Sequence, residues 1–74
     1  MIYLKAKNGA LFCYDEGTTV TLTLKNGRWE VSELTYSALM TEEGVSVISE
    51  KDASGLFGGN SPEQAILELQ AILN

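Results

Sequence analysis

The sequence predicts an α+β fold, in which an antiparallel sheet of four to six strands built from β-hairpins carries one C-terminal helix packed on it. Two observations support this prediction. Asn8-Gly9 and Asn26-Gly27 each lie between apolar runs, and Asn-Gly is the strongest short signal for a hairpin turn. Ser61-Pro62 marks the start of a helix after the last strand-like segment. Because the chain has 74 residues, we expect residues 1–74 to form a single domain.

The hairpin over residues 19–32 is the best defined of the predicted elements. Residues 19–24 alternate polar and apolar side chains, as a half-buried strand does. With a two-residue turn at Asn26-Gly27, each apolar residue of one strand faces an apolar residue of the other, as Leu24 faces Trp29. Directly paired residues share one face of a sheet, so the pattern predicts one apolar face and one polar face.

The hairpin over residues 2–14 carries large apolar residues on both predicted faces. A two-residue turn at Asn8-Gly9 divides the side chains of its strands into two sets. One face then holds Ile2, Leu4, Ala6, Leu11 and Cys13, and the other holds Tyr3, Lys5, Lys7, Phe12 and Tyr14. The first set predicts that Cys13 points inward as a small hydrophobic residue. The second set predicts an aromatic and basic strand face, which is either covered or exposed.

The middle of the chain is the most ambiguous part. Residues 35–40 could form a strand or a short helix. The turn over residues 42–44 and the β-branched run over residues 45–48 favour a third hairpin. Residues 50–60 are predicted to form a glycine-containing loop, in which Leu56 and Phe57 fill part of the core.

The C-terminal helix is predicted to run from Pro62 to about Leu73. Ser61 can cap its first turn, and Gln64 completes a capping box. At 100° per residue, an apolar stripe forms that should face the sheet. This stripe contains Ala65, Ile66, Leu69, Ile72 and Leu73, whereas Leu67 and Ala71 fall on the solvent side. The predicted core comprises Leu4, Val20, Leu22, Leu24, Trp29, Val31, Val47, Ile66, Leu69 and Ile72.

The composition argues against catalysis. The chain contains no histidine, which is the commonest general base and metal ligand, and Cys13 is its only cysteine. The paired carboxylates lie in predicted turns, where solvated acids are ordinary. We therefore expect no enzyme activity, no cofactor and no metal site. No apolar run is long enough to cross a membrane and the N-terminus lacks a signal-peptide layout, so a cytoplasmic location is expected.

The net charge of −5 is unevenly spread along the chain. Residues 1–28 hold four basic and two acidic side chains, whereas residues 29–74 hold one lysine and eight carboxylates. An acidic surface favours a partner with a basic surface. The candidate contact residues on this acidic half are Glu42, Glu43, Glu50 and Asp52.

Two apolar or aromatic surfaces offer other ways to bind. Tyr3, Phe12 and Tyr14, with lysines beside them, could stack the bases of a single-stranded nucleic acid. Leu67, on the outer side of the predicted helix, could contribute to a patch for self-association, because small domains often gain stability by associating.

Residues 35–74 show a partial resemblance to a known family. The predicted order there is strand, acidic turn, strand and glycine-containing loop, followed by Gly59-Asn60-Ser61-Pro62-Glu63-Gln64-Ala65 and a helix. This order resembles the small β-sheet domain of HicB-type antitoxins, in which an Asp-x-x-Gly loop leads into Gly-Asp-Thr-x-Glu-Glu-Ala and a helix. Asp52-Ala53-Ser54-Gly55 stands at the loop position, whereas the family's aromatic-Pro-Asp-Leu-Pro run has no counterpart. The resemblance implies a strand-strand-helix unit that makes protein contacts.

These features together predict a small, acidic, non-catalytic protein-binding or regulatory module. It would be antitoxin-like or an accessory protein of a phage or mobile element. Its partner would be a protein with a basic surface or a second copy of the chain. The alternative is a single-stranded nucleic-acid binder that uses the N-terminal aromatic and lysine strand face.

Overall fold

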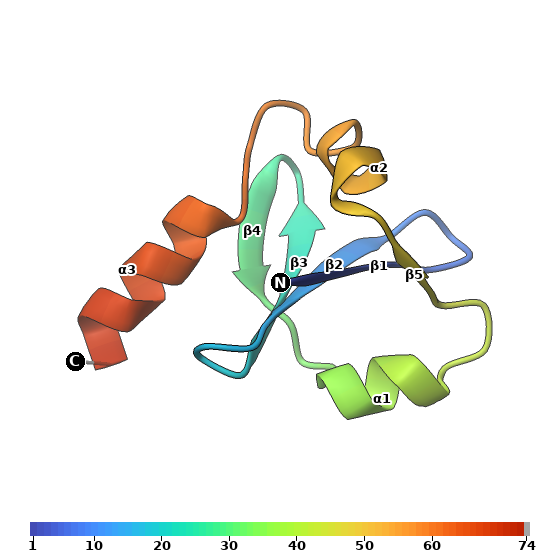
Figure 1. The fold of residues 1–74 in the computed structure, drawn as a ribbon, viewed down its shortest axis with the longest axis horizontal. Helices are drawn as coiled ribbons and strands as arrows, with labels where there is room; N and C mark the ends of the chain where they lie inside the picture. The colour runs from blue at the N-terminus through green and yellow to red at the C-terminus, as the bar shows by residue number, and fades with distance from the viewer. Residues whose placement is uncertain (74) are drawn as a thin grey trace.

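Five antiparallel strands form one sheet in the order β4-β3-β2-β1-β5, which confirms the predicted α+β class (Figure 1). The computed structural model describes residues 1–73. The strands are β1 (Ile2–Lys5), β2 (Leu11–Asp15), β3 (Val20–Lys25), β4 (Arg28–Val31) and β5 (Ser46–Ile48). The helices are α1 (Tyr36–Thr41), α2 (Glu50–Ser54) and α3 (Glu63–Leu73). Two short helices therefore accompany the predicted C-terminal one, and within residues 1–73 no helix is long and apolar enough to span a membrane.

The hairpin of β3 and β4 has the predicted register and turn. Leu24 pairs with Trp29, and Leu22 pairs with Val31. Asn26 and Gly27 have φ values of 52° and 77°, as a two-residue type I′ turn requires.

The hairpin of β1 and β2 differs from the prediction by one residue of register. The Ala6 N–H donates to the Ala10 C=O (2.8 Å), and three residues form the turn between them. The Asn8 Oδ1 accepts a hydrogen bond from the Ala10 N–H (3.0 Å), which favours this longer turn. As a result Tyr3 pairs with Cys13, and Leu4 pairs with Phe12. Because a one-residue shift moves side chains to the other face, the predicted faces of this hairpin were wrong.

The third predicted hairpin is not formed. Residues 36–41 form α1, whose first turn is capped by Thr35 through a hydrogen bond from the Ala38 N–H to Oγ1 (3.1 Å). Leu39 is 1% exposed and anchors α1 against Leu4 and Phe12. Strand β5 pairs with β1 instead of with residues 35–40.

The predicted loop over residues 50–60 begins with a helix, α2. Ser49 caps it by accepting a hydrogen bond from the Asp52 N–H (3.1 Å), and Ala53 is fully buried. Phe57 fills part of the core as predicted, whereas Leu56 is 45% exposed. The Ser-x-x-Asp pattern before α2 is a helix-start signal, which the glycines that follow obscure.

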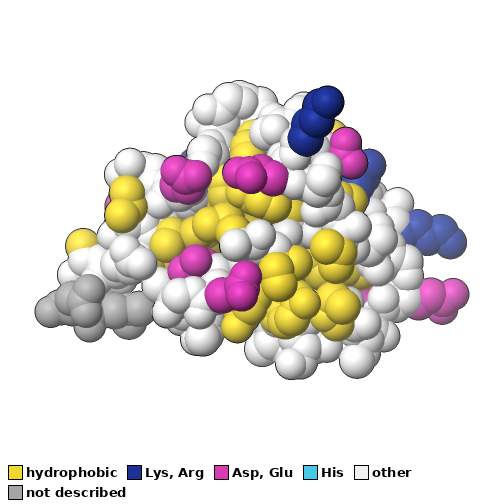
Figure 2. Space-filling view, in the orientation of Figure 1, with side chains coloured by type: hydrophobic (Ala, Val, Ile, Leu, Met, Phe, Trp, Pro, Cys, Tyr) yellow, Lys and Arg dark blue, Asp and Glu magenta, His cyan; other side chains and the backbone are white. Residues whose placement is uncertain are grey.

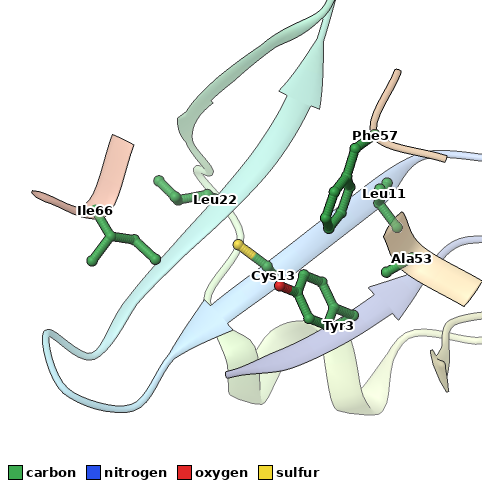
Figure 3. Close-up of a cluster of buried hydrophobic side chains, with 7 residues drawn as sticks. All are labelled: Tyr3, Leu11, Cys13, Leu22, Ala53, Phe57 and Ile66. Carbon is green, nitrogen blue, oxygen red and sulfur yellow. The ribbon is translucent and has the colours of Figure 1, made fainter. Parts of the chain in front are cut away.

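Helices cover both faces of the sheet. Helix α1 packs on one face, together with Leu4 and Phe12. Helices α2 and α3 pack on the other, which we call the α2/α3 face. The core cluster on this face contains Tyr3, Leu11, Cys13, Leu22, Ala53, Phe57 and Ile66 (Figure 3). Because both faces of β1 and β2 are covered, these strands carry apolar residues at nearly every position.

The predicted core was partly correct. Leu4, Leu22 and Ile66 are buried, and Val20, Leu24, Trp29 and Leu69 are partly buried against the core. By contrast, Val31, Val47 and Ile72 are exposed, which corrects the prediction for these three. Val31 and Val47 lie on the two edge strands of the sheet, and Ile72 lies near the end of α3, which projects away from the sheet (Figure 1).

Candidate functional site

Strand β4 presents an unpaired edge of the sheet. The Ser32 N–H donates to the Thr21 C=O (2.8 Å), so Thr21 and Ser32 form a hydrogen-bonded pair. Pairs with and without hydrogen bonds alternate along an antiparallel ladder, so Val31 and Trp29 belong to pairs without hydrogen bonds. The main-chain groups of Trp29 and Val31 therefore point away from the sheet. Among residues 1–73, no hydrogen bond occupies these outward-pointing groups. Strand β4 can therefore accept another strand through two of its residues.

An apolar groove, which we call the edge groove, runs between β4 and α3. Its apolar lining consists of Leu22, Trp29, Val31, Ala65, Leu69 and Ile72. It adjoins a more polar hollow of about 240 Å³ near Gly27 and Gln64. Val31 is 58% exposed and Ile72 is 79% exposed, although both belong to stripes that the sequence assigns to the core. The groove is therefore an apolar surface that the described part of the chain leaves uncovered.

Two hydrogen bonds fix the closed end of the edge groove. The Trp29 Nε1–H donates to the Asn60 C=O (2.8 Å), and the Asn60 Nδ2 donates to the Gly27 C=O. The Phe57 ring packs edge-on against the Trp29 ring, with centroids 5.6 Å apart. These contacts tie the start of α3 to the β3–β4 turn. Near the other end of α3, Ile72 is exposed.

The charges around the edge groove are few. Glu68 is the acidic residue at the groove itself. Arg28 and Glu30 lie on the opposite face of β4, where both are exposed and flank Trp29 in sequence. On the face shown in Figure 2, the visible basic side chains lie mainly at the end of the molecule away from α3, and the end that carries α3 is acidic and apolar. Arg28 is the basic residue near α3, since it lines the polar hollow together with Gln64.

A second hollow, of about 390 Å³, lies beside α1. The Tyr14 and Tyr36 rings stack at its wall, with centroids 4.5 Å apart and an interplanar angle of 15°. Its other lining residues are mainly hydroxyl-bearing, and none of them is charged. The hollow offers polar contacts but no group suited to acid–base chemistry.

The structure separates the three aromatic residues predicted to share a strand face. Tyr3 is 4% exposed on the α2/α3 face, and burial, followed by the nearby Cys13, raises the pKa of its hydroxyl. Phe12 is 8% exposed on the α1 face. Tyr14 is partly buried in its stack with Tyr36. The three residues therefore do not share one strand face, and of the two alternatives left open by the sequence, coverage of both faces is the one observed.

The four predicted acidic contact residues surround the other edge strand, β5. Glu42 and Glu43 follow α1, whereas Glu50 and Asp52 lie in the first turn of α2, and all four are exposed. They do not border the edge groove. Leu67 is 59% exposed, as predicted, but it is not among the residues that line the groove.

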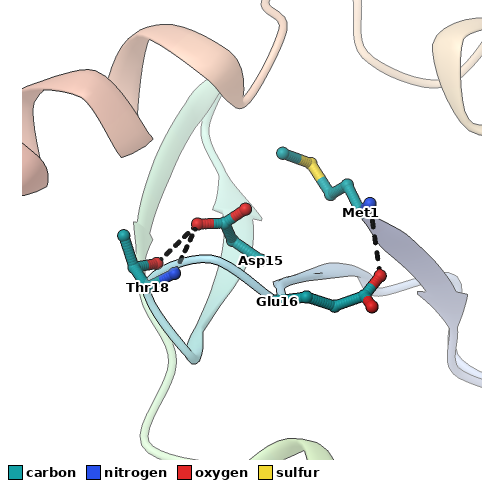
Figure 4. Close-up of polar contacts among 4 residues, drawn as sticks. All are labelled: Met1, Asp15, Glu16 and Thr18. Atoms are coloured by element: carbon teal, nitrogen blue, oxygen red, sulfur yellow. Dashed lines mark hydrogen bonds and ion pairs between the residues drawn. The ribbon is translucent and has the colours of Figure 1, made fainter.

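The remaining reactive groups have structural roles. Cys13 is fully buried, and burial raises the pKa of its thiol to about 12, which suppresses nucleophilic reactivity. Asp15 Oδ2 accepts hydrogen bonds from the Thr18 hydroxyl (2.7 Å) and amide (2.9 Å), and the Met1 amino group lies 3.6 Å from Glu16 (Figure 4). Across residues 1–73, no group of three or more acidic or cysteine side chains is placed to hold a metal ion.

Sequence reasoning missed the edge groove because its residues carry the signature of a core. Val31 and Ile72 sit at correct positions in an apolar strand face and an apolar helix stripe. Nothing in such a pattern tells whether the apolar side chain is covered by the same chain or left for a partner.

Comparison of the chain with protein-family models, with curated proteins and with solved structures finds no significant match.

Proposed function

We propose that this chain is a small, non-catalytic protein-binding module whose contact surface is the edge groove. The observation that carries the proposal is the free edge of β4, with outward-pointing main-chain groups at Trp29 and Val31 beside exposed apolar side chains. An edge strand of this kind can bind another protein by strand addition, in which main-chain bonds supply affinity and side-chain pockets supply specificity.

The chemistry of the chain supports a non-catalytic role. Its sequence contains no histidine, and its single thiol is buried in the protonated form. A cytoplasmic location is part of the proposal. The one cysteine is buried and free, so the chain has no internal disulfide that an oxidising compartment would maintain. The antitoxin-like and mobile-element roles remain predictions. The nucleic-acid alternative is disfavoured, because Tyr3 and Phe12 are buried on opposite faces of the sheet.

The acidic residues around β5 define a second candidate surface. Glu42, Glu43, Glu50 and Asp52 all lie close in sequence to this edge strand and are solvent-exposed. A basic partner held there would bind through exposed charges, and its affinity would fall steeply with added salt. The edge groove is favoured as the main contact because it combines apolar surface with free main-chain groups.

Two matched valine variants test the proposal. Val31 on β4 and Val47 on β5 are 58% and 55% exposed on opposite edge strands, so neither change should unfold the protein. Tagged Val31→Glu should lose the protein partners that the wild-type chain captures from its host, including untagged copies of itself. Tagged Val47→Glu should retain them. Loss with Val47→Glu and retention with Val31→Glu would reject the edge groove in favour of the β5 surface.

A further inference from the structure

The geometry of β4 restricts how a second copy of the same strand can pair with it. In an antiparallel pair, a residue whose main-chain groups point outward must lie opposite another such residue. Since the main-chain groups of Trp29 and Val31 point outward, the two-fold axis that relates two paired β4 strands can pass through Trp29, Glu30 or Val31. Each of these three registers brings a different set of charges together.

The charges of β4 favour the axis through Trp29. In that register Arg28 faces Glu30 of the second copy, and the same pair recurs on the other side of the axis. Facing side chains on paired strands lie about 4.5–5.5 Å apart at Cβ, so these opposite charges would attract. An axis through Glu30 would instead place two Glu30 carboxylates face to face. An axis through Val31 would form no pair of opposite charges.

We propose that this chain forms a homodimer in which β4 pairs antiparallel with β4 of a second copy, about a two-fold axis at Trp29. The proposal rests on the function proposed above and names a second copy as the partner. The main-chain groups of the two Trp29 residues would exchange two hydrogen bonds. Val31 would lie opposite Gly27 of the second copy, whose C=O already accepts a hydrogen bond from the Asn60 side chain, so the Trp29 pair would supply the main-chain bonds.

The other edge strand lacks the features that favour self-pairing. Strand β5 has three residues, of which Val47 alone points its main-chain groups outward by the same alternation. Carboxylates precede and follow it in the sequence, at Glu43 and Glu50. Short strands with flanking charges are a common protection of sheet edges.

Reversing the two charges tests both the dimer and its register. Arg28 and Glu30 are exposed, so the variants Arg28→Glu and Glu30→Arg should fold as the wild type does, which circular dichroism checks. Sedimentation velocity from micromolar to millimolar protein measures the dimer dissociation constant. Each single variant should raise this constant about tenfold or more, because two attractive pairs become repulsive. The double variant, which restores opposite charges across the axis, should dimerise nearly as well as the wild type.

The possible outcomes separate this inference from the proposed function. A double variant as weak as the single ones would overturn the register at Trp29. A wild-type chain that stays monomeric at millimolar concentration, or a dimer indifferent to these charges, would overturn the β4 dimer. In either of these cases, selective loss of captured partners in Val31→Glu would still support the edge groove as a protein-binding surface. Equal capture by Val31→Glu and the wild type would reject the proposed function itself.

Discussion

Thr19 adopts a left-handed backbone conformation, with φ of 59°, in the turn between β2 and β3. For a β-branched residue this region is strained, at a cost of about 1–2 kcal/mol, whereas glycine adopts it freely. Thr19→Gly should therefore raise the free energy of unfolding by about 0.5–1 kcal/mol, after allowing for the flexibility of glycine in the unfolded chain. Thermal or urea unfolding measures the change.

Thr18 provides the matched control for this variant. It precedes Thr19 in the same turn but donates two hydrogen bonds to Asp15. Thr18→Gly should lower stability, because it removes the hydroxyl donor. If Thr19→Gly proved less stable than the wild type, the strain at this position would be outweighed by the hydrogen bond that the Thr19 hydroxyl donates to the Thr18 C=O (2.6 Å).

Asp15 makes stability depend on pH in the acid range. The hydrogen bond from the Thr18 hydroxyl, followed by the main-chain amides of the turn, lowers the pKa of its carboxyl below the ordinary value. Because the folded pKa is lower than the unfolded value of about 4, the stabilisation is present above that value. It is lost as the pH falls through the folded pKa.

The variant Asp15→Asn should remove this part of the acid sensitivity. Urea unfolding at about pH 5 and about pH 2 measures the loss of stability in each protein. The loss should be smaller in Asp15→Asn than in the wild type, and Thr18→Val should reduce it as well. An unchanged difference between the two pH values would show that the Asp15–Thr18 contact does not contribute.

At the level of elements, α3 is held by its first turns. Ile66 is 6% exposed in the core cluster, whereas Leu69 is half-buried and Ile72 is 79% exposed. Ile66→Ala should cost about 2–5 kcal/mol of stability, as a buried aliphatic truncation does. Leu69→Ala should cost less, and Ile72→Ala should change stability by less than about 0.5 kcal/mol. Denaturant unfolding of the three variants measures this gradient, and equal losses at Ile66 and Ile72 would contradict it.

The two Asn-Gly hairpins show how much local sequence determines. Asn26-Gly27 lies between strands whose apolar residues match only in a two-residue register, so both its turn and its faces were predictable. Asn8-Gly9 lies between strands that are apolar on both faces, so side-chain pattern does not select the register. The hydrogen bond to the Asn8 side chain contributes to the choice of the longer turn, and no periodicity reports it.

The two short helices mark another limit of sequence pattern. Helix α1 has six residues and α2 has five, which is too short for a helical repeat of apolar residues to emerge. Each is capped by a hydroxyl side chain and holds one buried residue, Leu39 in α1 and Ala53 in α2. Such helices depend on packing against the sheet, so their existence follows from the tertiary structure rather than from local propensity.

At the scale of the whole molecule, burial and binding compete for the same kind of residue. Helices α1 and α2 cover the centre of the sheet, while β4 and the far end of α3 retain exposed apolar side chains. The position of this surface depends on how α3 leaves the sheet. It could not be predicted from the apolar stripes alone, because those stripes are the same for a buried and an exposed helix end.

We propose that the β4 edge binds protein, in the first place a second copy of the chain. Amide hydrogen exchange, followed by nuclear magnetic resonance at rising protein concentration, is the measurement to make. The Trp29 amide should become protected from exchange as the protein concentration rises, while the Val47 amide on the other edge strand should exchange at a constant rate. Protection of Val47 with no change at Trp29 would rule out binding at the β4 edge.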